Sequence, residues 1–368
     1  MLNNEVAVVC LCCRVYLQTS TISELKAFLS LHPIRWKQVY QLCAMHRVRP
    51  VVLQVLCQLA QEVPKEILQL FRNYCREFLL FAADRKMEAD RIVGLLQAQG
   101  IAARLYKGTE CAMLLYRDIG MREFTDMDII IEDKQLRAVT DLMLAEGYEM
   151  QQAAYFRRFP TRYKRQLKDI AFGKRCPRGR RFSFEFHYRP TKPLMPVQYT
   201  FSELLGPDYL NRNYNNQDYY TLLLLNNGAS DFFPHLRSLL DMALIWQKEQ
   251  VTPPAGLKPY DILWRQLAHT LLGFDTHQQP PAHNNTYHLL LRRLQQPQLP
   301  GKYTFLQQAY VNLANAETVK EKSRLLQQYL LFLLRPNGND IETYKLPYPA
   351  YYFTKPLRLT FNLLRRIG

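Results

Sequence analysis

Two aspartates separated by one residue, Asp126 and Asp128, lie at the start of a β-branched apolar run over 127–131. Alternate side chains of a strand share a face, so both carboxylates are expected to point together while Met127 and Ile129 enter the core. Carboxylate oxygens bind Mg²⁺ or Mn²⁺, and two such ions can clamp the attacking and leaving oxygens of a phosphoryl transfer. Taken alone, such a pair more often marks a solvated strand edge, so the prediction depends on its neighbours.

A short apolar segment over 101–106 precedes the acidic pair and ends in Lys107-Gly108-Thr109, where a helix over 109–116 is expected to begin. A glycine here lets the backbone approach a phosphate, and the new helix offers free N–H groups to it. Thr109 either donates to a phosphate oxygen or simply caps the helix. Lys107 is either a phosphate contact or a surface lysine, and the sequence favours neither.

A third carboxylate follows in the segment 182–188, where phenylalanines alternate with polar residues. The period of two places the phenylalanines on a buried face and Ser183, Glu185 and His187 on the other. Glu185 is thereby positioned to complete a metal site, with His187 beside it. Without the first two elements, an exposed glutamate on a half-buried strand would be the better interpretation.

In this order the three elements resemble the nucleotidyltransferase superfamily that includes polymerase-β-like enzymes, and most closely its bacterial branch of uncharacterised nucleotidyltransferases. Two departures are visible: Thr109 stands where the wider superfamily has Gly or Ser, and Asn226-Asn227 stand where the branch often has histidines. The motifs that carry the resemblance are Lys107-Gly108, Leu115-Tyr116, Arg122, Asp126-Met127-Asp128-Ile129 and Glu185-Phe186-His187.

The resemblance implies transfer of a nucleoside monophosphate from a nucleoside triphosphate to a hydroxyl acceptor, which is a protein, an RNA or a small molecule. Asp126, Asp128 and Glu185 would hold Mg²⁺ or Mn²⁺, with Glu185 on the ion that activates the acceptor. Pyrophosphate would be released. His187 is as well explained by a structural hydrogen bond. The implied nucleotide contacts are Lys107, Gly108, Thr109, Arg122 and His187.

Two other functions remain open. A glycosyltransferase also uses an Asp-x-Asp pair to bind a metal and a nucleotide sugar, but a larger nucleotide-binding sheet would precede the pair. Only one short strand does so here. The second alternative is a non-catalytic protein that binds nucleotide or nucleic acid. No phosphate loop of the Gly-x-x-x-x-Gly-Lys-Ser/Thr type and no Gly-x-Ser-x-Gly elbow occur, which leaves kinase and serine-hydrolase functions without support.

Periodicity predicts an α+β fold in which a small mixed-sheet palm is embedded between helical regions. The expected division is an N-terminal helical region over 1–98, a palm over 99–192, a helical domain over 193–335 and a basic amphipathic tail over 336–368. Strands are expected at 101–106, 127–131, 148–151, 169–172 and 182–188, with helices at 109–116 and 134–146 between them.

The chain carries a formal net charge of +16, and residues 157–181 hold eleven basic residues against one acid, Asp169. This stretch either attracts the triphosphate or an anionic acceptor such as RNA, or is a solvated basic hairpin. The amphipathic segment 356–367 is expected to dock on its own protein rather than on an anionic membrane. The cysteines lack metal-site spacing, and no secretion signal is evident, so we expect a cytoplasmic protein.

Overall fold

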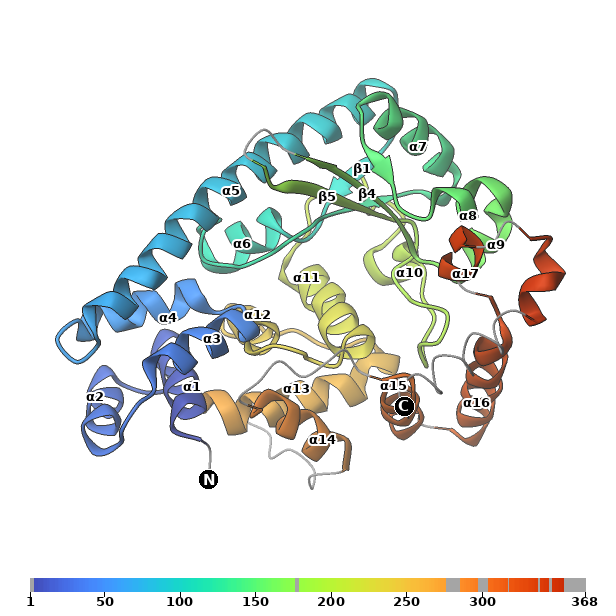
Figure 1. The fold of residues 1–368 in the computed structure, drawn as a ribbon. Helices are drawn as coiled ribbons and strands as arrows, with labels where there is room; N and C mark the ends of the chain where they lie inside the picture. Colours follow the sequence, from blue (N-terminus) through green and yellow to red (C-terminus); the bar gives the residue numbers. More distant parts are fainter. Residues whose placement is uncertain are drawn as a thin grey trace, which may run out of the picture.

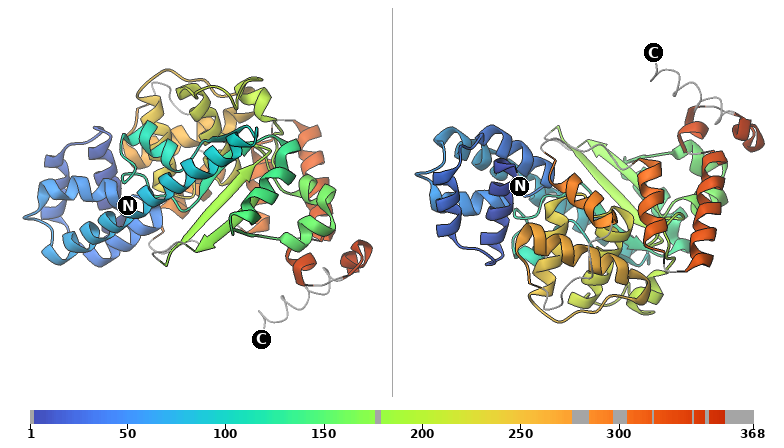
Figure 2. Two further views of the ribbon diagram at one scale, coloured as in Figure 1. Left: turned by 90° about the horizontal axis from the view of Figure 1, so that it is seen from above. Right: turned by 90° about the horizontal axis from the view of Figure 1, so that it is seen from below.

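The structure is a computed structural model that describes residues 3–175, 179–275, 285–296, 304–316, 318–336, 338–343 and 346–353. A five-stranded sheet lies between helices drawn from both ends of the chain, which confirms the predicted α+β fold (Figure 1). The N-terminal helices lie at one end of the molecule, and α16 (Val319–Leu334) and α17 (Gly338–Thr343) lie at the other (Figure 2).

The sheet has the order β1-β2-β5-β4-β3, in which β2 and β5 run parallel and all other neighbours run antiparallel. The parallel pair sets Asp128 directly beside Glu185, because these two residues are register partners. In the same way Asp169 lies beside His187 across β4 and β5. The strands are β1 (Ala103–Leu105), β2 (Met127–Ile131), β3 (Glu149–Met150), β4 (Asp169–Arg175) and β5 (Arg181–His187).

One face of the sheet is closed by helices. The long helix α5 (Lys65–Ala98) presents Ala89, Ile92 and Leu96 to the same buried cluster as β2 and β5. Helix α7 (Leu136–Ala145) adds to this cluster and ends before Gly147, whose φ of +77° suits a glycine. The predicted alternation therefore holds: the phenylalanines of β5 are buried among these helices, and the polar side chains face away from them.

A second and larger core joins helices from the beginning and the later part of the chain. Most of its residues come from helices that precede most of the strands in the sequence and from helices that follow them. The N-terminal helices and the later helices therefore share one hydrophobic core. The helices concerned are α1 (Asn4–Tyr16), α2 (Ile22–Leu31), α3 (Trp36–His46), α4 (Arg49–Leu56), α6 (Thr109–Tyr116), α10 (Phe201–Leu205), α11 (Asn216–Leu223), α12 (Leu236–Trp246), α13 (Lys258–Leu272) and α14 (Asn285–Leu294).

The observed elements differ from the expected ones in length and in three places. Helix α11 continues as a π-helical turn over Leu224–Ser230, and α15 (Phe305–Ala314) was not expected. The basic stretch is no simple hairpin, because α8 (Ala153–Arg158) ends in it and α9 (Pro160–Gln166) precedes the strand pair. The expected tail helix over 356–367 lies outside the described residues. Within the described part of the chain, no helix is both long enough and apolar enough to span a membrane.

Candidate functional site

The turn at Gly108 brings the chain from β1 to α6 and lies against the acidic pair. Gly108 has φ +59° and ψ −117°, and a Cβ placed there would lie 3.2 Å from the carbonyl oxygen of Asp126. Both the backbone conformation and the close approach therefore require glycine. Gly108 is the N-cap residue of α6, and no side chain caps this helix. The structure therefore does not show Thr109 in the capping role that was one of the two alternatives. The Thr109 hydroxyl is buried and has no hydrogen-bond partner among the described residues.

Asp128 is the most deeply held of the three predicted carboxylates, with 4% of the residue exposed. The ammonium of Lys107 donates to its Oδ1 at 3.1 Å, and His187 Nε2 lies 2.8 Å from the same oxygen. Although burial by itself raises the pKa of Asp128, Lys107 and His187 hold it well below its usual value. Asp128 is therefore ionised, and the ammonium of Lys107 offsets part of its negative charge.

Glu185 has the opposite electrostatic environment. Burial, together with the charges of Asp128 and Asp169, raises the pKa of Glu185 to about 8. Its Oε2 lies 3.6 Å from His187 Nε2. A carboxyl held neutral by neighbouring carboxylates marks a position where negative charge lacks compensation, and a divalent cation would supply it.

His187 lies beneath these carboxylates and is 1% exposed. Its Nδ1 is 3.6 Å from Asp169 Oδ2, and the ring of Tyr106 packs edge-on at 5.4 Å. Burial and the neighbouring Lys168 lower the pKa of His187, so the ring is neutral and can hold its orientation between two carboxylates.

A metal ion would find its ligands here. One oxygen each from Asp128 and Glu185 and one nitrogen from His187 all lie within 4.8 Å of one another. Asp126 is not part of this group, but it lines the same cavity. The carboxylate oxygens of this cavity suit Mg²⁺ or Mn²⁺, and His187 Nε2, 2.8 Å from Asp128 Oδ1, orients one of these carboxylates. The donor set therefore fits the ion that the sequence motifs lead us to expect.

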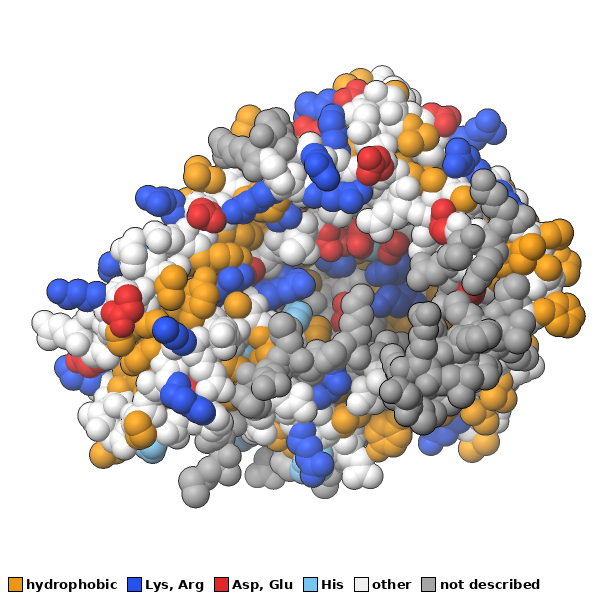
Figure 3. Space-filling view, viewed as in Figure 1, with side chains coloured by type: hydrophobic (Ala, Val, Ile, Leu, Met, Phe, Trp, Pro, Cys, Tyr) orange, Lys and Arg blue, Asp and Glu red, His pale blue; other side chains and the backbone are white. Residues whose placement is uncertain are grey.

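The carboxylates open into a cavity of about 330 Å³ between the sheet and the helices (Figure 3). Acidic and basic side chains lie side by side in this hollow, so it is highly polar. Arg47 and Lys168 make no side-chain hydrogen bond to any described residue, which leaves both cations available to a ligand. The charged residues of its lining are Arg47, Lys107, Arg122, Asp126, Asp128, Lys168, Asp169, Glu185, Lys192, Asp231 and Arg237.

Arg122 lies in the wall of this cavity, but its guanidinium is bonded within the protein. Its Nε and Nη2 donate to the carboxylate of Asp241 at 2.9 to 3.1 Å, and Tyr116 donates to the same carboxylate at 2.9 Å. Arg122 and Asp241 are 3% and 0% exposed at their side chains. This ion pair connects α12 to the segment that precedes β2. It therefore helps to hold in place the backbone that leads into Asp126 and Asp128.

The sequence-predicted residues thus come together in two layers. Six of them line the cavity, namely Lys107, Gly108, Arg122, Asp126, Asp128 and Glu185, whereas Thr109 and His187 are buried and do not line it. Six charged residues of the cavity were not among the predicted site residues, and they are Arg47, Lys168, Asp169, Lys192, Asp231 and Arg237. Lys168 and Asp169 lie in the basic stretch over 157–181, for which an anionic ligand was one of the two predictions, and the other four carry no local signal that marks them as site residues.

Most charges of the basic stretch contact other parts of the protein. Arg158 bonds to Tyr351 and Leu346, and Lys174 bonds to the carbonyl of Glu146. Arg162 packs over the ring of Tyr348, and Lys164, Arg180 and Arg181 pair with carboxylates. Lys168 is the only basic residue of this stretch, among those that the structure describes, that lines the polar cavity.

Comparison with known proteins agrees with this geometry. No curated protein and no solved structure matches the chain. A sequence profile of the family described as uncharacterised nucleotidyltransferase matches residues 32–255. This range includes every predicted site residue, the turn at Gly108 and the Arg122–Asp241 pair. The match extends over more than half of the 368 residues, and the chain therefore belongs to the uncharacterised nucleotidyltransferase family.

Proposed function

We propose that this protein transfers a nucleoside monophosphate from a nucleoside triphosphate to a hydroxyl acceptor and releases pyrophosphate. The observation that carries the proposal is the convergence of Asp126, Asp128 and Glu185 on one cavity beside the Gly108 turn. These residues come from segments far apart in the chain, and the parallel pairing of β2 with β5 brings them together.

The reaction forms one bond and breaks one. The acceptor oxygen bonds to the α-phosphorus while the bond from that phosphorus to the bridging β-oxygen breaks, and the acceptor proton leaves to a base. The protein's task is to align the two oxygens and to offset the charge that builds on them.

Asp126, Asp128 and Glu185 are the residues that would hold Mg²⁺ or Mn²⁺. Such an ion, when bound, neutralises phosphate charge and makes the acceptor hydroxyl easier to deprotonate. His187 orients Asp128 through the 2.8 Å contact and so acts as a positioning residue. Lys107 keeps Asp128 ionised and thus ready to act as a ligand.

The phosphate chain is proposed to lie against the turn before α6. Gly108 allows a close approach of the backbone there, and no side chain caps the start of α6. Lys107 lines the cavity at this turn, and Arg47 faces the same space. These cations offset the triphosphate charge, with Arg122 holding the wall through Asp241.

The proposal is tested by incubating the full-length protein with each α-labelled nucleoside triphosphate, Mg²⁺ or Mn²⁺, and a cell extract. Metal-dependent movement of label into an acceptor is expected. Asp126→Asn and Asp128→Asn keep side-chain volume and should abolish transfer. The matched control is Asp141→Asn, an exposed aspartate on α7, which should transfer label at the wild-type rate.

Two outcomes would contradict the proposal. Transfer from a labelled nucleotide sugar, but from no triphosphate, would indicate the glycosyltransferase alternative instead. Metal-dependent binding of triphosphate with no transfer to any extract component would indicate a non-catalytic binding protein. Membership of a nucleotidyltransferase family supports the first function over both.

A further inference from the structure

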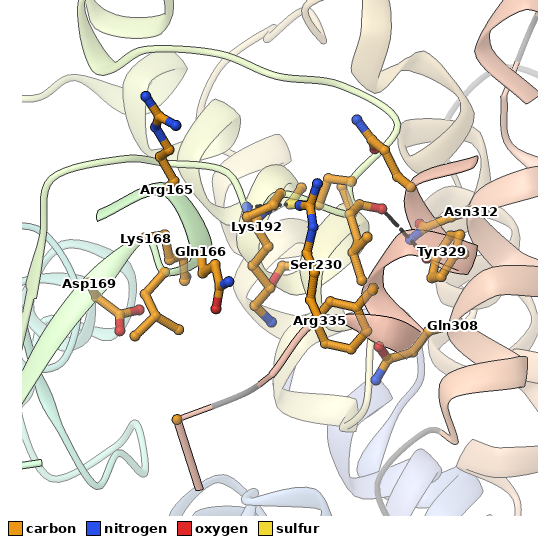
Figure 4. A pocket seen from close by; sticks show the side chains of 18 of the residues that line it. Arg165, Gln166, Lys168, Asp169, Lys192, Ser230, Gln308, Asn312, Tyr329 and Arg335 are labelled. Carbon is orange, nitrogen blue, oxygen red and sulfur yellow. Dashed lines mark hydrogen bonds between the residues drawn. The ribbon is translucent and has the colours of Figure 1, made fainter. Parts of the chain in front are cut away.

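A second cavity, of about 610 Å³ and lined by the side chains drawn in Figure 4, adjoins the polar one. The two share Lys168, Asp169 and Lys192 in their walls, so these residues form a seam between them. Cavities of several hundred cubic ångströms are the size of small-molecule sites. We call this second cavity the side chamber; it is defined by the seam and by residues of α15, α16 and the segment before α10.

The order of the strands places the side chamber on the acceptor side. The proposed phosphate turn at Gly108 follows β1, Asp128 is on β2, Glu185 is on β5, and Asp169 begins β4. The side chamber thus lies past Glu185, across the carboxylates from the turn. In an in-line displacement the acceptor enters opposite the leaving pyrophosphate. A group in the side chamber would approach from that direction.

The lining of the side chamber combines aromatic rings and amides with four basic side chains, Arg165, Lys168, Lys192 and Arg335. Tyr329 and Phe332 of α16 line it, and the Phe332 side chain is 41% exposed. The side-chain oxygens of Gln152 and Gln328 are buried without a hydrogen-bond partner among the described residues. An amide both donates and accepts, as a hydroxyl does, and an unpaired buried acceptor favours a ligand that donates. Asp169, at the seam, is the one acidic residue among the described lining.

We propose that the side chamber binds the acceptor, and that the acceptor is a small polyhydroxylated ring compound of the sugar class. This inference rests on the proposed nucleotidyl transfer. The C–H face of such a ring packs on Phe332, and its hydroxyls donate to Gln152 and Gln328. The reacting hydroxyl lies at the seam: its oxygen bonds to the α-phosphorus, pyrophosphate departs, and Asp169 takes the proton.

The far wall of the chamber lies beyond the part of the chain that defines the family. The family match ends at residue 255, whereas α15 and α16 span 305–334. The side-chain amide of Asn312 on α15 donates to the Tyr329 hydroxyl of α16 at 2.6 Å and to the carbonyl of Leu194. These hydrogen bonds hold α15 and α16 against the segment before α10, and so keep this wall next to the chamber. One wall of the proposed acceptor site, with Gln328 and Phe332, therefore comes from a segment outside the matched range, and the wall with Gln152 comes from inside it.

The test is saturation-transfer NMR on the full-length protein with Mg²⁺, using the methyl glycosides of glucose, galactose, mannose and N-acetylglucosamine as probes. Saturation of the ring protons of at least one glycoside is expected. Phe332→Ala and Gln328→Leu should weaken this binding by about tenfold or more. The matched controls on the same helix are Leu331→Ala and Gln327→Leu, which do not line the chamber and should bind as the wild type does.

Three NMR results would overturn the inference: no saturation of any of the four glycosides, equal binding by the chamber variants and their controls, or, in a parallel sample that contains ATP, loss of the ATP signals in Phe332→Ala. The last would show that the chamber holds the nucleobase. Failure of the proposed function looks different, because glycoside binding would then persist while no labelled nucleoside monophosphate is transferred. Label found in RNA or protein instead of a small molecule would also overturn the acceptor class.

Discussion

The buried pair of Arg122 and Asp241 allows a quantitative test of how the site is held. Replacing Asp241 with alanine leaves the Arg122 guanidinium buried without its counter-charge, and also leaves the Tyr116 hydroxyl without its acceptor. Breaking one partner of a buried pair costs about 3–5 kcal/mol. Arg237 increases the penalty, because burial and then the charge of Arg122 lower the pKa of Arg237 to about 10, while Asp241 opposes this shift.

The double variant Arg122→Met/Asp241→Leu removes both charges and fills similar volume, so it should recover most of this loss. The assay is unfolding in urea, followed by circular dichroism. If the slope of the unfolding free energy against urea concentration is unchanged, the shift in the midpoint concentration gives the change in the free energy of unfolding. The control is Glu146→Ala, which removes a partner of the exposed Arg91 and should cost less than about 1 kcal/mol. If Asp241→Ala were no worse than Glu146→Ala, or the double variant no better than Asp241→Ala, the reasoning would be refuted.

The same double variant separates two roles of Arg122. A direct contact with the triphosphate, as the family resemblance implies, predicts a rise of about tenfold or more in KM for the nucleotide. A purely structural pair leaves KM unchanged once the fold is restored. The geometry favours the second result, because Nε and Nη2 of Arg122 are both bonded to Asp241.

Further predictions follow from single residues. Gly108→Ala should destabilise the fold by about 1–3 kcal/mol and weaken nucleotide binding, whereas Gly94→Ala on α5, where a Cβ meets nothing within 4 Å, should be neutral or stabilising; thermal melting and nucleotide titration measure both. Mn²⁺ at about 100 times its Kd should stabilise the protein by about 2.7 kcal/mol, and this gain should vanish in Asp128→Asn; an equal gain in that variant would exclude the metal site. Hydrogen bonds from Arg35 lower the pKa of Glu5 to about 2, so this pair contributes stability above pH 4.5 that is lost as the pH falls toward 2. Because Arg35 is 69% exposed, the contribution is about 1 kcal/mol, and Glu5→Gln should flatten the acid limb of a stability-against-pH curve by that amount.

The sequence alone determined the local parts of the site. The β-branched run after Asp126 makes β2 and the phenylalanine alternation makes β5, because a strand's period of two separates buried from polar side chains whatever surrounds it. Gly108 marks its turn for a similar reason: its backbone conformation is one that other residues adopt only with strain. These signals act within a few residues, so the printed sequence was enough to recognise them.

Only the tertiary structure decided which of these parts meet. The parallel register puts Asp128 beside Glu185, and it arises from packing across 57 positions (185 − 128) rather than from any local preference. Arg122, which lines the cavity and is predicted to contact phosphate, also forms a buried ion pair with a partner 119 residues away in the sequence. Arg47 and Asp169 reach the cavity for the same reason: charges converge through the folding of distant segments, and no local pattern records that contact.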